Sequence, residues 1–131
     1  FLHPSEAQHG DLGILQEKDI MLVIYNSGMT REQIELIDLA KNLIEVIKYI
    51  VITSNPDSLL AEKSDVCLLT GRPAEVCCLG LTPTTSTTVM TVIGYILVVG
   101  TMKRIQFAPE DYAKRHHGGY LGDKSRGMTC K

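Results

Sequence analysis

The sequence predicts an α/β domain built on a parallel sheet. Three short apolar runs rich in branched residues, at 20–25, 49–53 and 66–69, indicate strands, and segments with helical spacing alternate with them. Runs that are apolar on both faces are typical of strands buried in a parallel sheet. Because strand and helix alternate, we expect a layered domain with right-handed crossover connections.

The first strand is expected at 20–25 and is followed by the turn N-S-G. Apolar residues then recur on successive turns of a helix that runs from Thr30 to about Asn42. Either Thr30 or Ser27 is expected to cap this helix, since a hydroxyl oxygen can accept from an otherwise unpaired backbone N–H.

The remaining elements follow the same alternation. We expect a strand at 49–53, a short helix through 59–61, a strand at 66–69, a glycine- and proline-punctuated loop at 70–83, a long helix from about 84 to 103 and a shorter helix starting near Pro109. Asp11-Leu12-Gly13 is expected to end a preceding helix.

Length and charge narrow the class of protein. The chain of 131 residues is expected to form one domain, 1–131. Its net charge is −2 and it lacks a basic patch, so nucleic acid is not an expected partner.

The cysteines and the longest apolar stretch indicate in which cellular compartment the protein is expected. Cys67, the adjacent pair Cys77-Cys78 and Cys130 lack metal-type spacing and indicate reduced thiols, which predicts a cytoplasmic protein. The longest apolar stretch, 89–102, is short of the roughly 20 residues that a membrane span needs, so we expect a buried core helix and no membrane partner. No signal peptide is recognisable at the start.

Two segments combine hydroxyl side chains with the expected start of a helix after a strand. One is N-S-G-M-T at 26–30 and the other is T-P-T-T-S-T-T at 82–88, which has six hydroxyls around one proline. Backbone N–H groups and the helix dipole at such positions bind phosphate without a lysine. Capping alone could use two or three of the hydroxyls, but the recurrence at two strand ends favours an anion site.

Four motifs together resemble one family. N-S-G-M-T-R-E at 26–32, A-E-V-C-C-L-G-L-T-P-T-T-S-T-T at 74–88 and R-H-H-G-G-Y-L-G at 115–122 resemble the sugar isomerase (SIS) domain. With H-P-S-E-A-Q-H-G-D-L-G at 3–13, the set is similar to the arabinose-5-phosphate isomerases in the form without CBS modules. The resemblance implies a three-layer αβα, flavodoxin-like fold around a central parallel sheet.

The resemblance also implies an enzyme, an aldose–ketose isomerase that interconverts D-arabinose 5-phosphate and D-ribulose 5-phosphate through an enediol, for Kdo, lipopolysaccharide or capsule synthesis. Such a reaction needs a general acid and a general base near C1 and C2 of the sugar. By similarity, the catalytic residues are Glu75, His116 and Glu32. The expected substrate- and phosphate-binding residues are Asn26, Ser27, Gly28, Thr30, Thr84, Thr85, Ser86, Thr87 and His9.

Each catalytic candidate also has a structural explanation. Glu32, in the first turn of a helix, could simply face the helix dipole. Glu75 is expected in a loop, where a solvated glutamate has little structural purpose. His116 and His117 precede Gly118-Gly119 and could form a surface turn, although histidine suits proton transfer near neutral pH.

No metal and no cofactor are expected. His3 and His9 do not have the spacing of a helical ligand pair, and the family reaction needs no metal. We expect substrate or subunit contacts for this segment, and a homo-oligomer, either dimer or tetramer, because SIS active sites are commonly completed by a neighbouring subunit.

The sequence departs from the family in several places. The family's first strand, with a lysine-bearing turn, has no counterpart upstream of residue 3, so the N-terminal strand is expected to be missing and an apolar sheet edge exposed. Met29, Tyr95 and Tyr25 replace an acid, an aspartate and a smaller hydroxyl residue. These departures keep open an alternative, a sugar-phosphate-binding SIS module without turnover.

Overall fold

The computed structural model describes residues 2–128, which divide between residues 91 and 92 into two compact units. The first unit holds α1 (Pro4–Ala7), the 3-10 helix η1 (Asp11–Ile14), β1 (Ile20–Ile24), α2 (Arg31–Leu43), β2 (Lys48–Thr53), α3 (Leu59–Lys63) and β3 (Val66–Leu69). The helix α4 (Thr85–Arg104) begins in the first unit and ends in the second, which also holds α5 (Pro109–Arg115) and α6 (Gly119–Arg126). That residues 1–131 form a single domain stays a prediction.

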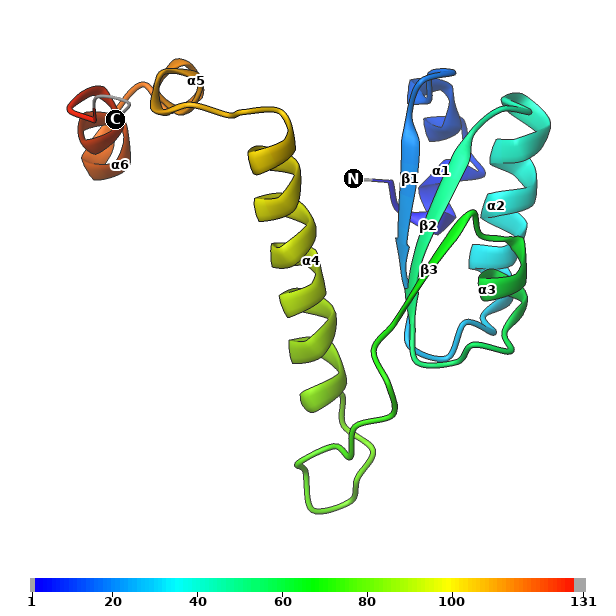
Figure 1. Cartoon of the computed structure of the whole chain (residues 1–131). Helices are drawn as coiled ribbons and strands as arrows, with labels where there is room; N and C mark the ends of the chain where they lie inside the picture. The colour runs from blue at the N-terminus through cyan, green and yellow to red at the C-terminus, as the bar shows by residue number, and fades with distance from the viewer. Residues whose placement is uncertain (1, 129–131) are drawn as a thin grey trace. The chain divides into compact units, whose positions relative to one another are not determined.

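The three strands form a parallel sheet in the order β1-β2-β3. Val23 lies opposite Val51, and Val51 lies opposite Cys67. The helices α1, α2 and α3 lie on one face of the sheet, as Figure 1 shows. The α/β class and the parallel sheet are therefore confirmed.

The core of the first unit lies between this face and α2. Leu36, Ile37 and Ala40 of α2 are at most 5% exposed, and they belong to one apolar cluster with Tyr49 and Val51 of β2. The Tyr49 hydroxyl donates to the Ile37 carbonyl at 3.0 Å, which satisfies a buried polar group and ties strand to helix.

The other face of β1 is open. Ile20, Leu22 and Ile24 are 61%, 45% and 48% exposed, and β1 forms one edge of the sheet. The expectation that this strand is buried on both faces is wrong for the first unit, since its helices α1 to α3 all cover the same face. An apolar run predicts burial only where a second layer covers it.

The sequence missed two short helices. Residues 11–14 form η1 instead of only ending α1, and 119–126 form α6 where a surface turn was considered. Gly119 has φ of +74°, and a Cβ on Gly122 would lie 2.5 Å from the His116 carbonyl oxygen. The glycines in this segment therefore allow the start of α6 and its close approach to the end of α5.

Within residues 2–128, one helix is long and apolar enough to span a membrane by length and composition alone. It is α4, with a mean hydropathy of 1.5 over an 18-residue window. One such helix is weak evidence for a span. Only 11% of this window is buried, so the expectation of a buried core helix at 89–102 is wrong for the described residues.

Candidate functional site

The loop after β1 is seated closely on the start of α3. Gly28 is buried and has φ of +66°, a left-handed conformation that favours glycine. A Cβ at this position would lie 2.3 Å from the Ser58 Oγ atom and 3.2 Å from the Thr53 Oγ1 atom. Only a glycine fits here without a shift of its neighbours.

Hydrogen bonds join this loop to the turn that follows β2. The Asn26 carbonyl accepts from Thr53 Oγ1 at 2.9 Å and from Ser54 Oγ at 2.8 Å. Asn55 Nδ2 donates to the Ser27 carbonyl at 3.3 Å. The carboxyl ends of two neighbouring parallel strands thus form one connected rim, the position where ligands gather in open α/β sheets.

Neither expected capping hydroxyl caps α2. Thr30 occupies the N-cap position, but its hydroxyl donates to the Tyr25 hydroxyl instead of accepting from the helix. Ser27 Oγ accepts from the backbone N–H of Met29 at 3.4 Å. The helix start was predicted correctly and the capping bond was not, because a neighbouring tyrosine competes for the hydroxyl.

Glu75 binds the start of α4. Its Oε2 atom accepts from the Thr84 backbone N–H and from Thr84 Oγ1, both at 2.8 Å, and from the Ser86 backbone N–H at 3.3 Å. Val76 N donates to Thr84 Oγ1 at 3.1 Å, so the loop and the helix start are joined twice. The expectation that a glutamate here has little structural purpose is wrong.

These donors hold Glu75 in the ionised form. The pKa of its carboxyl is lowered to about 2, first by the Ser86 side chain and then by the Thr84 backbone N–H. Donors that point at a carboxylate stabilise its charged state. The helix start therefore already binds one anion, which is the protein's own side chain.

Two of the six hydroxyls of 82–88 form hydrogen bonds within the segment. Thr87 Oγ1 and Thr88 Oγ1 donate to the Thr84 carbonyl at 2.8 and 2.9 Å, a common way for threonine to bond back within a helix. The Oγ1 atom of Thr85 is buried and has no hydrogen-bond partner among the described residues. A buried hydroxyl without a partner is unusual, so Thr85 has a hydrogen-bonding group that the described residues leave unused.

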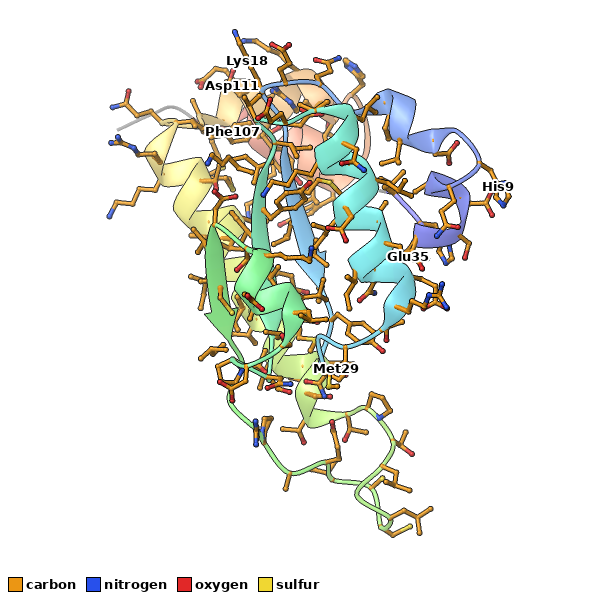
Figure 2. The ribbon with its side chains drawn as sticks, turned by 90° about the vertical axis from the view of Figure 1, so that its right-hand side faces the viewer. His9, Lys18, Met29, Glu35, Phe107 and Asp111 are labelled. Atoms are coloured by element: carbon orange, nitrogen blue, oxygen red, sulfur yellow. The ribbon has the colours of Figure 1, made fainter. Side chains whose placement is uncertain are left out.

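Glu32, His9 and His116 do not take part in the hydrogen bonds described above. His9 is exposed on the turn after α1, away from the Met29 loop in Figure 2. Glu32 is exposed in the first turn of α2. His116 belongs to the second unit, where it ends α5 and its ring lies 4.3 Å from that of Tyr112, measured between centroids.

Sequence reasoning missed the residues that support the first loop. Thr53 and Ser58, which are 0% and 2% exposed, hold Asn26 and enclose Gly28. The sequence signal for these residues was the turn S-N-P-D at 54–57, because it follows the second strand and so lies at the same end of the parallel sheet as the turn after the first strand.

The three cysteines within 2–128 are free, and Cys130 lies outside the described residues. Residues 2–128 hold no group of three or more side chains suited to a metal ion.

Comparison with known proteins assigns this arrangement to a family. A family model described as the SIS domain matches residues 1–100. The chain belongs to the SIS domain family. The resemblance found in the four motifs is thereby confirmed, and the loop after β1 and the start of α4 are parts of an SIS domain.

Several relatives carry an activity in their names. Arabinose 5-phosphate isomerase KdsD of Yersinia pestis is 45% identical over 124 residues, 95% of this chain and 37% of the relative. Among solved structures, a Bacteroides fragilis protein assigned as a phosphosugar isomerase involved in capsule formation is 73% identical, with a TM-score of 0.89 over 92% of this chain and 62% of that one. An Escherichia coli CFT073 protein in complex with arabinose 5-phosphate is 31% identical, with a TM-score of 0.82 over 88% of this chain and 61% of that one.

The SIS chain is much shorter than these relatives. It spans a little over a third of the curated isomerases and about three fifths of the solved chains.

Proposed function

We propose that this SIS chain serves an aldose–ketose isomerase that interconverts D-arabinose 5-phosphate and D-ribulose 5-phosphate through an enediol. The observation that carries the proposal is the Glu75 carboxylate, ionised and held beside the hydroxyl-rich start of α4. The KdsD relatives and the sugar-phosphate complex of the E. coli protein support the substrate class.

In this proposal the phosphate binds at the rim after β1. Asn26, Ser27, Gly28 and Thr30 supply the loop, whose backbone is held by the turn after β2. Thr84 to Thr87 close around the sugar, with the unpartnered Thr85 hydroxyl as a further donor. Oriented N–H groups and hydroxyls suffice to bind a phosphate dianion.

Glu75 takes the proton from C2 of the open-chain aldose and returns it to C1. The carboxylate must be ionised to accept the proton, and its pKa of about 2 ensures that at neutral pH. A base this weak transfers protons slowly, since the best catalytic pKa lies near the working pH. The proposal therefore requires the Thr84 and Ser86 donors to loosen when substrate binds, which raises the pKa of Glu75.

The remaining roles follow the family. Glu32 and His116 are proposed as further acid/base groups that serve ring opening and the sugar oxygens, and His9 as a substrate or subunit contact. We further propose a cytoplasmic homo-oligomer, dimer or tetramer, without cofactor, that supplies D-arabinose 5-phosphate for Kdo in lipopolysaccharide or capsule synthesis.

The second candidate is a sugar-phosphate-binding SIS module without turnover. The Glu75 contacts favour it specifically, because a carboxylate that caps a helix with a pKa of about 2 has a structural role that needs no chemistry.

Ketose formation from D-arabinose 5-phosphate, measured on the parent chain and on Glu75→Gln, separates the two. An isomerase loses turnover in Glu75→Gln and still gains thermal stability from the sugar phosphate. A binding module shows no turnover in the parent, with the same stabilisation in both proteins. Glu45→Gln, an exposed glutamate in the turn after α2, is the matched control and should behave as the parent. Turnover that survives in Glu75→Gln contradicts the assigned role of Glu75.

A further inference from the structure

The loop between β3 and α4 has a second internal anchor, the side chain of Cys77. Its Sγ atom accepts hydrogen bonds from the backbone N–H groups of Leu81 at 3.2 Å and of Thr82 at 3.1 Å. The Gly80 N–H donates to the Cys77 carbonyl at 2.9 Å, and Gly80 has φ of +64°. Residues 77–82 therefore form a closed turn around one sulfur atom.

This turn ends where the Glu75 contacts begin. Thr82 is joined to Thr84 through Pro83 alone, and proline has a fixed φ and no N–H. Thr84 donates to the Glu75 carboxylate through both its backbone N–H and its hydroxyl. A shift of Thr82 is therefore passed along a stiff connection to the two 2.8 Å contacts that Thr84 makes with Glu75.

We propose that Cys77 is a positioning residue for Glu75. Its sulfur closes the turn 77–82 and so holds Thr84 against the carboxylate that, under the proposed function, moves the proton. The role given to Glu75 rests on the proposed isomerase function. The closure of the turn 77–82 by the Cys77 sulfur does not depend on that function. Cys77 does not itself touch the substrate.

The properties of the sulfur support this role. The bonds from the Thr82 backbone, then from the Thr82 side chain, lower the pKa of Cys77 to about 7. A thiolate accepts stronger hydrogen bonds than a thiol, so the ionised form holds the turn more firmly. Cys77 is half-buried, whereas its neighbour Cys78 is exposed, which makes Cys78 a matched control.

The test compares Cys77→Ala, Cys77→Ser and Cys78→Ala in the full chain, with two measurements. The first is the hydrogen exchange of the Leu81 and Thr82 amides. Exchange should become at least several-fold faster in Cys77→Ala than in the parent and stay unchanged in Cys78→Ala. This measurement does not depend on turnover, and unchanged exchange in Cys77→Ala overturns the inference.

The second measurement is the kinetics of D-arabinose 5-phosphate conversion. In Cys77→Ala, kcat should fall by about tenfold with KM near that of the parent, the size expected when hydrogen bonds that position a reacting group are lost. Cys77→Ser keeps an acceptor and should recover most of this loss. An unchanged kcat in Cys77→Ala, or equal losses in the alanine and serine variants, overturns the inference. A parent without turnover refutes the proposed function instead, and the amide exchange then decides whether sulfur closes the turn.

Discussion

Substitution of Gly28 by alanine tests how the candidate phosphate loop is held. Gly28 has φ of +66°, and an added Cβ would lie 2.3 Å from Ser58 Oγ and 2.6 Å from Ser58 Cβ. Ser58 cannot turn away freely, because its hydroxyl accepts from Ala61 N at 3.2 Å and donates to the Asn55 carbonyl at 2.9 Å. Either the loop moves or α3 loses its N-cap.

The expected cost has two parts. A non-glycine residue in the left-handed conformation costs about 1 kcal/mol. Loss of a serine N-cap costs about 1 kcal/mol as well. Together they predict that Gly28→Ala lowers the free energy of unfolding by about 2 kcal/mol, which for a chain of this size lowers Tm by roughly 6–10 °C.

Urea and thermal unfolding followed by far-UV circular dichroism would measure this loss. Gly13→Ala is the control, since no atom lies within 4 Å of a Cβ added there and its backbone is not left-handed. In the Gly28→Ala background, Ser58→Ala should cost less than in the parent, because the cap is already disturbed. A Gly28→Ala protein as stable as the parent would refute the proposed packing of the loop on Ser58.

Three further predictions concern stability. The pKa of Glu75 is lowered from 4.5 to about 2, so its contribution to the free energy of unfolding is present above pH 4.5 and is lost as the pH falls towards 2. In urea unfolding measured against pH, Glu75→Gln should therefore weaken the loss of stability below pH 4.5. An unchanged loss in this variant contradicts the contacts of Glu75 with the start of α4. Burial raises the pKa of Tyr49 from 10.0 to about 12, so stability should be lost as the pH rises between these values; Tyr49→Phe should remove that alkaline loss and cost about 1 kcal/mol at neutral pH, as urea titrations would show. Leu60 is 0% exposed and Leu59 is 52% exposed. Leu60→Ala should therefore lower the free energy of unfolding by about 2–5 kcal/mol and Leu59→Ala by less than about 1 kcal/mol, as urea titrations would show. Equal losses in the two variants would contradict the packing of α3 on the sheet.

The strands and main helices were predictable because local patterns carry them. The apolar run at 66–69 matches β3 at both ends, and Pro109 starts α5 as expected. The helix after Thr30 was found from its apolar spacing, which places Ile37 and Ala40 in the core. Such patterns reflect burial on one side of an element, a property that neighbouring residues encode.

The candidate site was predictable as residues and not as contacts. The sequence identified Glu75 and the hydroxyls after it, but the use of Thr84 and Ser86 as donors to that carboxylate depends on how the loop folds back. The competition of Tyr25 for the Thr30 hydroxyl was likewise hidden. Several hydrogen-bond acceptors lie close to one donor along the chain, and the sequence does not show which of them the donor uses.

By itself, the sequence determined the α/β class, the three strands with the helices between and after them up to α5, and the resemblance to the SIS family. The α/β class and the elements follow from the spacing of apolar residues. The family resemblance follows from motifs that have particular side chains or glycines at fixed positions. The tertiary structure alone decided which face of β1 is open, why Gly28 must be glycine, and that Glu75 caps α4. The physical reason is that such properties depend on atoms many residues apart, Gly28 against Ser58 and Glu75 against Ser86, whose approach no local pattern specifies.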